Sequence, residues 1–167
     1  MRVTHKQLVD LVLPVLHTAC KGWQDYIRRA IERGERIELD ECDLNSAAWW
    51  AAQYGQVECL KLLISAGLSQ WGIDSAARWS SAYGQVECLK ALLAVGLSQF
   101  SIDEAAGWAS VYGHIECLRL LLTAGVSRFG IDEAARRATS GGRVECLKLL
   151  IATGLSQAGI DEARRAA

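Results

Sequence analysis

The sequence is poor in proline, has almost no net charge and contains no long apolar run. One proline occurs in 167 residues, and 18 basic side chains nearly balance 19 acidic ones, so the formal net charge is −1. Near-neutrality argues against a protein that binds nucleic acid by neutralising phosphates, because that mode needs a basic excess or a basic face. No apolar run approaches the roughly 18 residues of a membrane-spanning helix. We therefore expect a partner that is neither a nucleic acid nor a membrane.

Apolar residues, in contrast, are abundant enough to build a core. Hydrophobic residues make up 51% of the chain and charged residues 22%, which is the composition of a folded domain. The segment Met1–Cys20 has the early basic residues of a lipoprotein signal peptide, but Asp10 interrupts its apolar stretch and His17 stands where such a signal has an apolar residue. We therefore expect no signal peptide and predict a single cytoplasmic domain, residues 1–167.

The chain repeats itself every 29 residues. The motif Gly-x-Val/Ile-Glu-Cys-Leu-Lys/Arg occurs four times, at Gly55–Lys61, Gly84–Lys90, Gly113–Arg119 and Gly142–Lys148. A fixed period of this size indicates a solenoid. We divide the chain into an N-terminal helix, five repeats and a partial C-terminal cap, with the boundaries 1–12, 13–45, 46–74, 75–103, 104–132, 133–161 and 162–167.

Each repeat is predicted to form two helices. The first, helix A, starts after an aspartate that caps its free N–H groups and runs to the first glycine of the motif. The second, helix B, ends at a glycine that suits a left-handed C-terminal cap. The aspartates are Asp74, Asp103, Asp132 and Asp161, and the closing glycines are Gly67, Gly96, Gly125 and Gly154. Helix B has a wide apolar face and helix A carries small residues, which favours stacked helical hairpins.

Four blocks of the sequence resemble the helical part of an ankyrin repeat. The resemblance is carried by Ala51–Gly67, read Ala-Ala-Gln-Tyr-Gly-Gln-Val-Glu-Cys-Leu-Lys-Leu-Leu-Ile-Ser-Ala-Gly, and by its later copies within residues 13–161. It implies an all-α, ankyrin-like helical-hairpin solenoid that is not an enzyme and binds a partner protein through hairpin tips and the concave face of helices A. The connection Gly67–Ala76 is shorter than the family's, so we expect the β-hairpin finger to be reduced or missing after the second repeat. Residues 35–45 are long enough for one finger.

No part of the sequence has the spacing of a catalytic or metal site. Four cysteines recur once per repeat on the apolar face of helix B, where equivalent residues lie about 8–10 Å apart. That separation is too large for a disulfide or a shared zinc ion, so we predict buried, reduced, metal-free thiols. The histidines have neither a partnered nucleophile nor a ligand spacing. We predict no enzyme activity and no cofactor. The cysteines are Cys59, Cys88, Cys117 and Cys146, and the histidines are His5, His17 and His114.

Aromatic residues are the informative feature. Trp–Tyr pairs at i, i+4 fall on one face of three successive helices A, whereas the fourth has Arg137 and Gly141 there. The pairs are Trp50 and Tyr54, Trp79 and Tyr83, and Trp108 and Tyr112. Two interpretations stay open: the pairs pack between repeats, or they line the concave face as a binding strip. Residues 46–100 carry only three basic and three acidic side chains, which is typical of an interface. A second aromatic column falls near the loops, at Trp71, Phe100 and Phe129.

We therefore predict a non-catalytic protein–protein interaction module, an adaptor or scaffold that binds its partner on the face of helices A. The predicted contact residues are Trp50, Tyr54, Trp79, Tyr83, Trp108, Tyr112 and Arg137. The alternative is a structural protein that forms homo-oligomers through incompletely capped solenoid ends, because 162–167 supplies only a helix A fragment. An enzyme is the weakest hypothesis, since it would need a catalytic group from residues 35–45, the one long irregular stretch.

Overall fold

The computed structural model describes residues 41–65 and 67–154, and these residues form eight α-helices without a strand. The helices are α3 (Glu41–Gln53), α4 (Val57–Ser65), α5 (Gln70–Ala82), α6 (Val86–Val95), α7 (Gln99–Tyr112), α8 (Ile115–Ala124), α9 (Arg128–Ser140) and α10 (Val144–Thr153). The predicted all-α class is confirmed. The expected N-terminal helix, most of the expected first repeat and the expected C-terminal cap lie outside the described residues.

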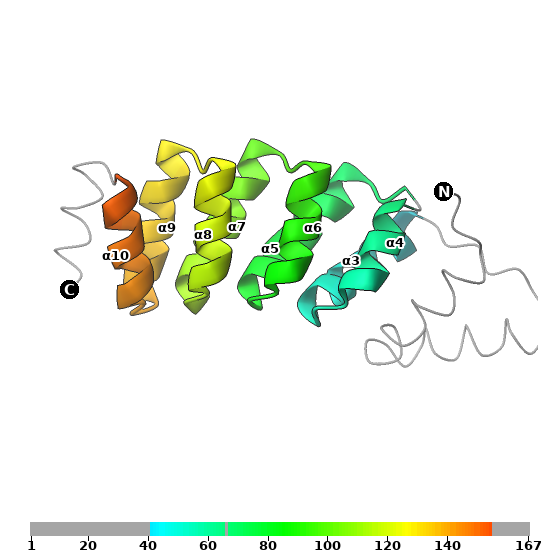
Figure 1. Ribbon diagram of the computed structural model, residues 1–167, viewed down its shortest axis with the longest axis horizontal. Helices are drawn as coiled ribbons and strands as arrows, with labels where there is room; N and C mark the ends of the chain where they lie inside the picture. Colours follow the sequence, from blue (N-terminus) through cyan, green and yellow to red (C-terminus); the bar gives the residue numbers. More distant parts are fainter. Residues whose placement is uncertain (1–40, 66, 155–167) are drawn as a thin grey trace, which may run out of the picture.

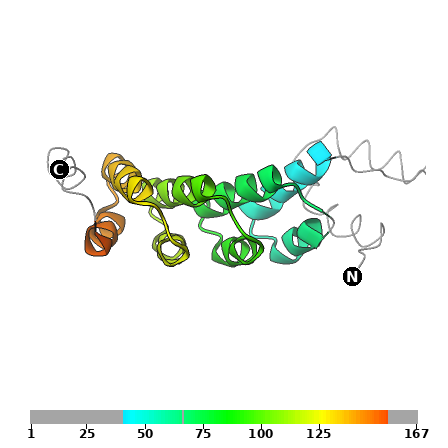
Figure 2. The ribbon, with the colours of Figure 1, turned by 90° about the horizontal axis from the view of Figure 1, so that it is seen from above.

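The helices stand side by side in two rows (Figure 1). Helices α3, α5, α7 and α9 are the helices A of successive repeats, and α4, α6, α8 and α10 are the helices B. Figure 2 shows the two rows as two layers, with helices A along one side and helices B along the other. Neighbouring helices A pack directly against each other along their row. The predicted solenoid of helical hairpins is confirmed.

Small residues on helices A allow this close packing. One position of each helix A, directly after Trp50, Trp79, Trp108 or Arg137, holds a small and fully buried residue. These residues are Ala51, Ser80, Ala109 and Ala138. Helices B contribute the larger core side chains, which are leucines at 0% exposure: Leu60, Leu63, Leu89, Leu92, Leu118, Leu121 and Leu150. Together these side chains form one core between the two layers.

Helix A starts one turn earlier than the sequence predicted. Helices α5, α7 and α9 begin four residues before the aspartates that we expected to cap them. The true N-caps are serines, whose hydroxyl oxygens accept hydrogen bonds from the third N–H of each helix: Ser69, Ser98 and Ser127. The extra turn occupies the place of the β-hairpin finger, which is absent from 67–154 as expected. Residues 41–45 of the expected irregular stretch are helical, and 35–40 lie outside the described residues.

The aspartates join successive repeats instead. The backbone N–H of Ser98 donates to Oδ1 of Asp74 at 3.2 Å, and its hydroxyl donates to Oδ2 at 2.8 Å. Ser127 binds Asp103 in the same way, at 2.8 and 2.5 Å. Each serine therefore caps its own helix and also bonds to the preceding repeat. These contacts hold the N-terminal ends of helices A together.

The other ends of helices A are joined by the residue that precedes helix B. Its side chain forms a hydrogen bond with a carbonyl in the last turn of helix A of the previous repeat. Carbonyls in the last turn have no partner within their own helix. The pairs are Gln85 with Gln53 (3.0 Å), His114 with Ala82 (3.0 Å) and Arg143 with Val111 (3.1 Å). Successive helices A are thus linked by hydrogen bonds at both ends.

The four repeat cysteines are free and buried, as predicted. Burial raises the pKa of the Cys59, Cys88 and Cys117 thiols to about 11, because an apolar environment disfavours the thiolate. Burial also raises the pKa of Cys146. The neutral thiol is a poor nucleophile and a poor metal ligand, so these side chains act as small core residues.

We expect Ser80→Ala to stabilise the protein. The Ser80 hydroxyl is buried and has no hydrogen-bond partner among the described residues, whereas the three equivalent positions are alanines. Its removal should raise the free energy of unfolding by about 1–2 kcal/mol. Urea denaturation measures this change, with Ser140→Ala on the exposed side of α9 as the control. A lower midpoint for Ser80→Ala would contradict the interpretation.

Asp103→Ala should lower the free energy of unfolding by about 2–3 kcal/mol, because two hydrogen bonds from Ser127 to a carboxylate are lost. Asp103→Asn should cost less, since Asn45 already holds the hydroxyl of Ser69 at the equivalent place, at 3.0 Å. Glu87→Ala, which removes only an exposed ion pair, is the control and should be nearly neutral. Equal losses of stability in Asp103→Ala and Glu87→Ala would show that the hydrogen bonds between Ser127 and Asp103 contribute little.

The four thiols should resist alkylation in the native protein at pH 8 and react after unfolding. Since folding raises their pKa above the unfolded value of about 8.5, the neutral thiol stabilises the native state fully below pH 8.5. For Cys59, Cys88 and Cys117 this contribution is lost as the pH rises towards 11. Mass spectrometry of labelled peptides assigns the reaction to individual cysteines. Cys88→Ser should cost about 1–3 kcal/mol, and rapid native labelling of Cys88 would disprove its burial.

Candidate binding surface

The three Trp–Tyr pairs lie on α3, α5 and α7, and the two rings of each pair stack on each other. The ring centroids are 5.7 Å apart in Trp50 and Tyr54, 5.8 Å in Trp79 and Tyr83, and 5.9 Å in Trp108 and Tyr112. Residues four apart on a helix are surface neighbours, so the i, i+4 spacing produces this contact. We call these six residues the aromatic ladder.

The two rings of each pair differ in their exposure. The tyrosines are 46–49% exposed, whereas the tryptophans are half-buried, and Trp50 and Trp79 pack against the core. The packing interpretation of the sequence agrees with the position of Trp50 and Trp79, and the binding interpretation stays a prediction. The indoles contribute to packing, and the phenol rings face solvent.

The residue before each tryptophan determines what fills the junction with the next repeat. Trp49 packs against Trp79 with 5.0 Å between centroids and the ring planes tilted by 44°, so an indole fills the junction of α3 and α5. Gly107 leaves room for Arg137 of α9, because a Cβ at Gly107 would lie only 2.8 Å from the guanidinium. At the junction of α5 and α7 the corresponding residue is Arg78, and this junction is hollow.

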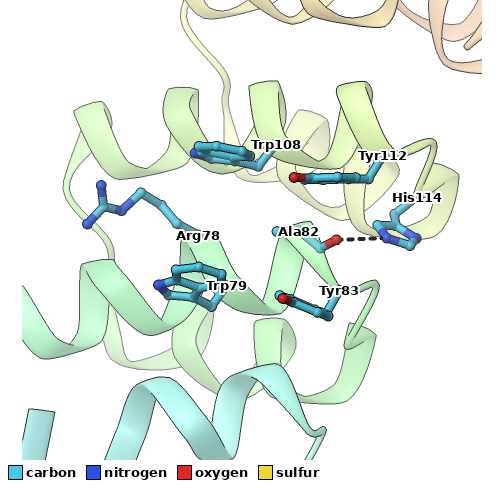
Figure 3. A pocket seen from close by; sticks show the side chains of 7 residues that line it. All are labelled: Arg78, Trp79, Ala82, Tyr83, Trp108, Tyr112 and His114. Carbon is cyan, nitrogen blue, oxygen red and sulfur yellow. Dashed lines mark hydrogen bonds between the residues drawn. The ribbon is translucent and has the colours of Figure 1, made fainter. Parts of the chain in front are cut away.

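The hollow between α5 and α7 has a volume of about 570 Å³. Its lining residues are Arg78, Trp79, Ala82, Tyr83, Trp108, Tyr112 and His114. Figure 3 shows one Trp–Tyr pair on each side, with Arg78 at the tryptophan end and His114 at the tyrosine end. We call this cavity the aromatic slot. It can accept a flat or aliphatic group between two pairs of rings.

Arg137, on α9 in the fifth repeat, ends the ladder. Its guanidinium lies 5.7 Å from the centroid of the Trp108 ring and pairs with Glu104 at 2.8 Å and Glu133 at 2.7 Å. Burial opposes ionisation of Glu133, but hydrogen bonds from Arg136 and Arg137 lower its pKa below the ordinary value. The charge of Arg137 is thus compensated within the chain.

A second aromatic row is more exposed than the ladder. Trp71, Phe100 and Phe129 are 65%, 73% and 77% exposed. We expected them near loops, but they lie in the first turns of α5, α7 and α9 because these helices start early. A recurring signal marks that start: a serine N-cap with an apolar residue directly before it and another four residues after it, the spacing of a hydrophobic staple, as in Leu68 and Ile73.

Sequence reasoning missed three of the residues that line the slot, which are Arg78, Ala82 and His114. For Arg78 a signal was available, since it is a lone cation within an aromatic stretch that has few charges. For Ala82 and His114 no local pattern exists, because their role depends on the packing of α5 against α7.

Among the residues that the structure describes, no three His, Cys, Asp or Glu side chains lie close enough together to hold a metal ion. Within 41–65 and 67–154, no helix combines the length and the apolar character needed to cross a membrane.

A comparison with protein-family models matches residues 43–72 to the ankyrin repeat. The matched range covers most of α3, all of α4 and the first residues of α5. A comparison with curated proteins yields no match. Ankyrin repeats are typically non-catalytic modules that bind other proteins. The predicted resemblance to the ankyrin-repeat family is therefore confirmed: residues 43–72 match its repeat, and α5–α10 continue the same helix pairs as an all-α solenoid.

Proposed function

We propose that the chain is a protein–protein interaction module whose partner docks on the face of helices A, across α3, α5 and α7. The aromatic ladder is the observation that carries this proposal, because it places three stacked pairs at intervals of one repeat with their tyrosines half exposed. Tryptophan and tyrosine are enriched among the residues that dominate binding energy. The proposed contacts are Trp50, Tyr54, Trp79, Tyr83, Trp108 and Tyr112, with Arg137 at the end of the row.

The distribution of charge supports the same face. Between residues 46 and 100, the two ion pairs lie on helices B, Glu58 with Lys61 and Glu87 with Lys90. The helix A face thus has the low charge of an interface core. The hydrogen bonds at both ends of helices A also fix the Trp–Tyr pairs relative to each other. Less conformational entropy is then lost when a partner binds.

The proposal includes an intracellular setting and an adaptor or scaffold role. One free, buried thiol occurs in each of the four described repeats. Free thiols are typical of proteins in reducing compartments, where disulfides are rare.

Self-association through solenoid ends is a second candidate. Val144 and Ile151 on α10, the last described helix, are 59% and 46% exposed, which favours an apolar contact there. The expected cap lies outside the described residues. Sedimentation velocity across a wide concentration range separates the candidates, since a monomer at every concentration would remove this one.

We expect Tyr83→Ala to weaken partner binding by about 2 kcal/mol, roughly thirtyfold, with little change in the urea midpoint. The ring is half exposed, so its loss leaves the core intact. Affinity capture with quantitative mass spectrometry compares this variant with the wild type. Phe100→Ala is the matched control, because it removes a more exposed ring outside the ladder. Undiminished capture by Tyr83→Ala, together with loss in Phe100→Ala, would move the binding site to the second aromatic row.

Trp79→Ala separates packing from binding in the same Trp–Tyr pair. Trp79 is half-buried and packs against the core, so its removal should reduce both affinity and stability. A loss of stability near the 3–5 kcal/mol of a core deletion, with affinity unchanged in the folded fraction, would assign this indole to packing alone.

A further inference from the structure

We propose that the aromatic slot between α5 and α7 binds an apolar side chain from an acidic segment of the partner, with a neighbouring carboxylate paired to Arg78. This inference rests on the proposed function and specifies the chemistry that the partner must present.

The slot has room for an apolar side chain together with the peptide backbone that carries it. Its volume of about 570 Å³ falls within the range of small-ligand sites. Two stacked Trp–Tyr pairs form its sides, and rings of this kind pack well against aromatic or aliphatic groups. Ala82 also contributes to the opening, because the equivalent residues at the ends of α3 and α7 are the larger Gln53 and Val111.

The slot has one positively charged lining residue without a counter-ion. Arg136, at the equivalent position on α9, pairs with Glu133 three residues before it. Three residues before Arg78 stands Ser75, which carries no charge. The next repeat has Glu104 at that position, but this carboxylate pairs with Arg137. Among the described residues, Arg78 consequently has no hydrogen-bond or ion-pair partner.

The remaining charges of residues 46–100 are already engaged. They belong to the two ion pairs on helices B and to Asp74, which binds Ser98. A free guanidinium at the edge of the slot disfavours a cationic occupant, although the aromatic walls alone would suit one. It favours a carboxylate, with which arginine forms charge-assisted and often bidentate hydrogen bonds. Because two of the Trp–Tyr pairs of the ladder line the slot, its occupant belongs to the protein that docks on that ladder.

The test uses the full chain labelled with ¹⁵N and three short capped peptides. The central residues are Phe-Asp in the first, Phe-Asn in the second and Gly-Asp in the third, each flanked by glycine. Indole N–H signals of Trp79 and Trp108 report binding in NMR titrations. We expect the Phe-Asp peptide to shift both signals and to bind about fivefold tighter than the Phe-Asn peptide, with a preference that shrinks as salt is added. The Gly-Asp peptide should not shift them.

Three variants make the assignment specific. Arg78→Gln should abolish the preference for Phe-Asp and leave the affinity for Phe-Asn unchanged. Arg119→Gln is the matched control, because it removes an exposed arginine from α8 and should keep the preference. Ala82→Gln introduces the residue found at the end of α3 and should weaken both phenylalanine peptides, with circular dichroism confirming the fold.

Equal affinity for Phe-Asp and Phe-Asn, or a preference that survives in Arg78→Gln, would overturn the inference. Tighter binding of a matched peptide with trimethyl-lysine in place of Phe-Asp would also overturn it and would identify a cation site. Either result, with partner capture still lost in Tyr83→Ala, leaves the proposed function standing. Undiminished partner capture by Tyr83→Ala overturns the proposed function, whichever peptide binds.

Discussion

One serine hydroxyl per junction, shared between its own helix and the repeat before it, is the contact on which the solenoid depends. The oxygen of Ser98 accepts from a backbone N–H of α7 while its proton goes to Asp74 of α5. The same group therefore decides where helix A begins and where its neighbour stands. Because this contact leaves no chain for a β-hairpin, the repeat shortens and helix A gains a turn.

Fixed positions along the row place the Trp–Tyr pairs of successive helices A at intervals of one repeat. Hydrogen bonds at both ends prevent neighbouring helices A from sliding, and small buried residues such as Ser80 and Ala109 bring their backbones close. Within this regular frame, the residue before each tryptophan varies freely. An indole fills one junction, a paired arginine fills another, and the junction that carries Arg78 stays open.

The sequence was sufficient for features that depend on local spacing. The 29-residue period is visible in the sequence itself. The two helices per repeat, the buried cysteines and the shared face of the i, i+4 pairs follow from it and from helical spacing. The start of helix A was wrong because both Ser98 and Asp103 are good N-cap residues. The staple spacing favours the serine locally, and the hydrogen bond from Ser98 to Asp74, 24 residues away along the chain, adds a contact that N-cap preference does not include. The open slot was missed for the same reason, since it depends on side chains from adjacent repeats.

A site that arises from one variable position in a periodic array can be multiplied by copying. Tandem duplication of the 29-residue block that contains Arg78 would preserve the register, because serine–aspartate hydrogen bonds link this block to both of its neighbours. The longer protein would present two slots at a fixed separation, and a partner with two matching segments would bind it with an avidity that neither slot provides alone. Affinity in such a scaffold can therefore increase by gene duplication alone, without any substitution that creates a new contact with the partner.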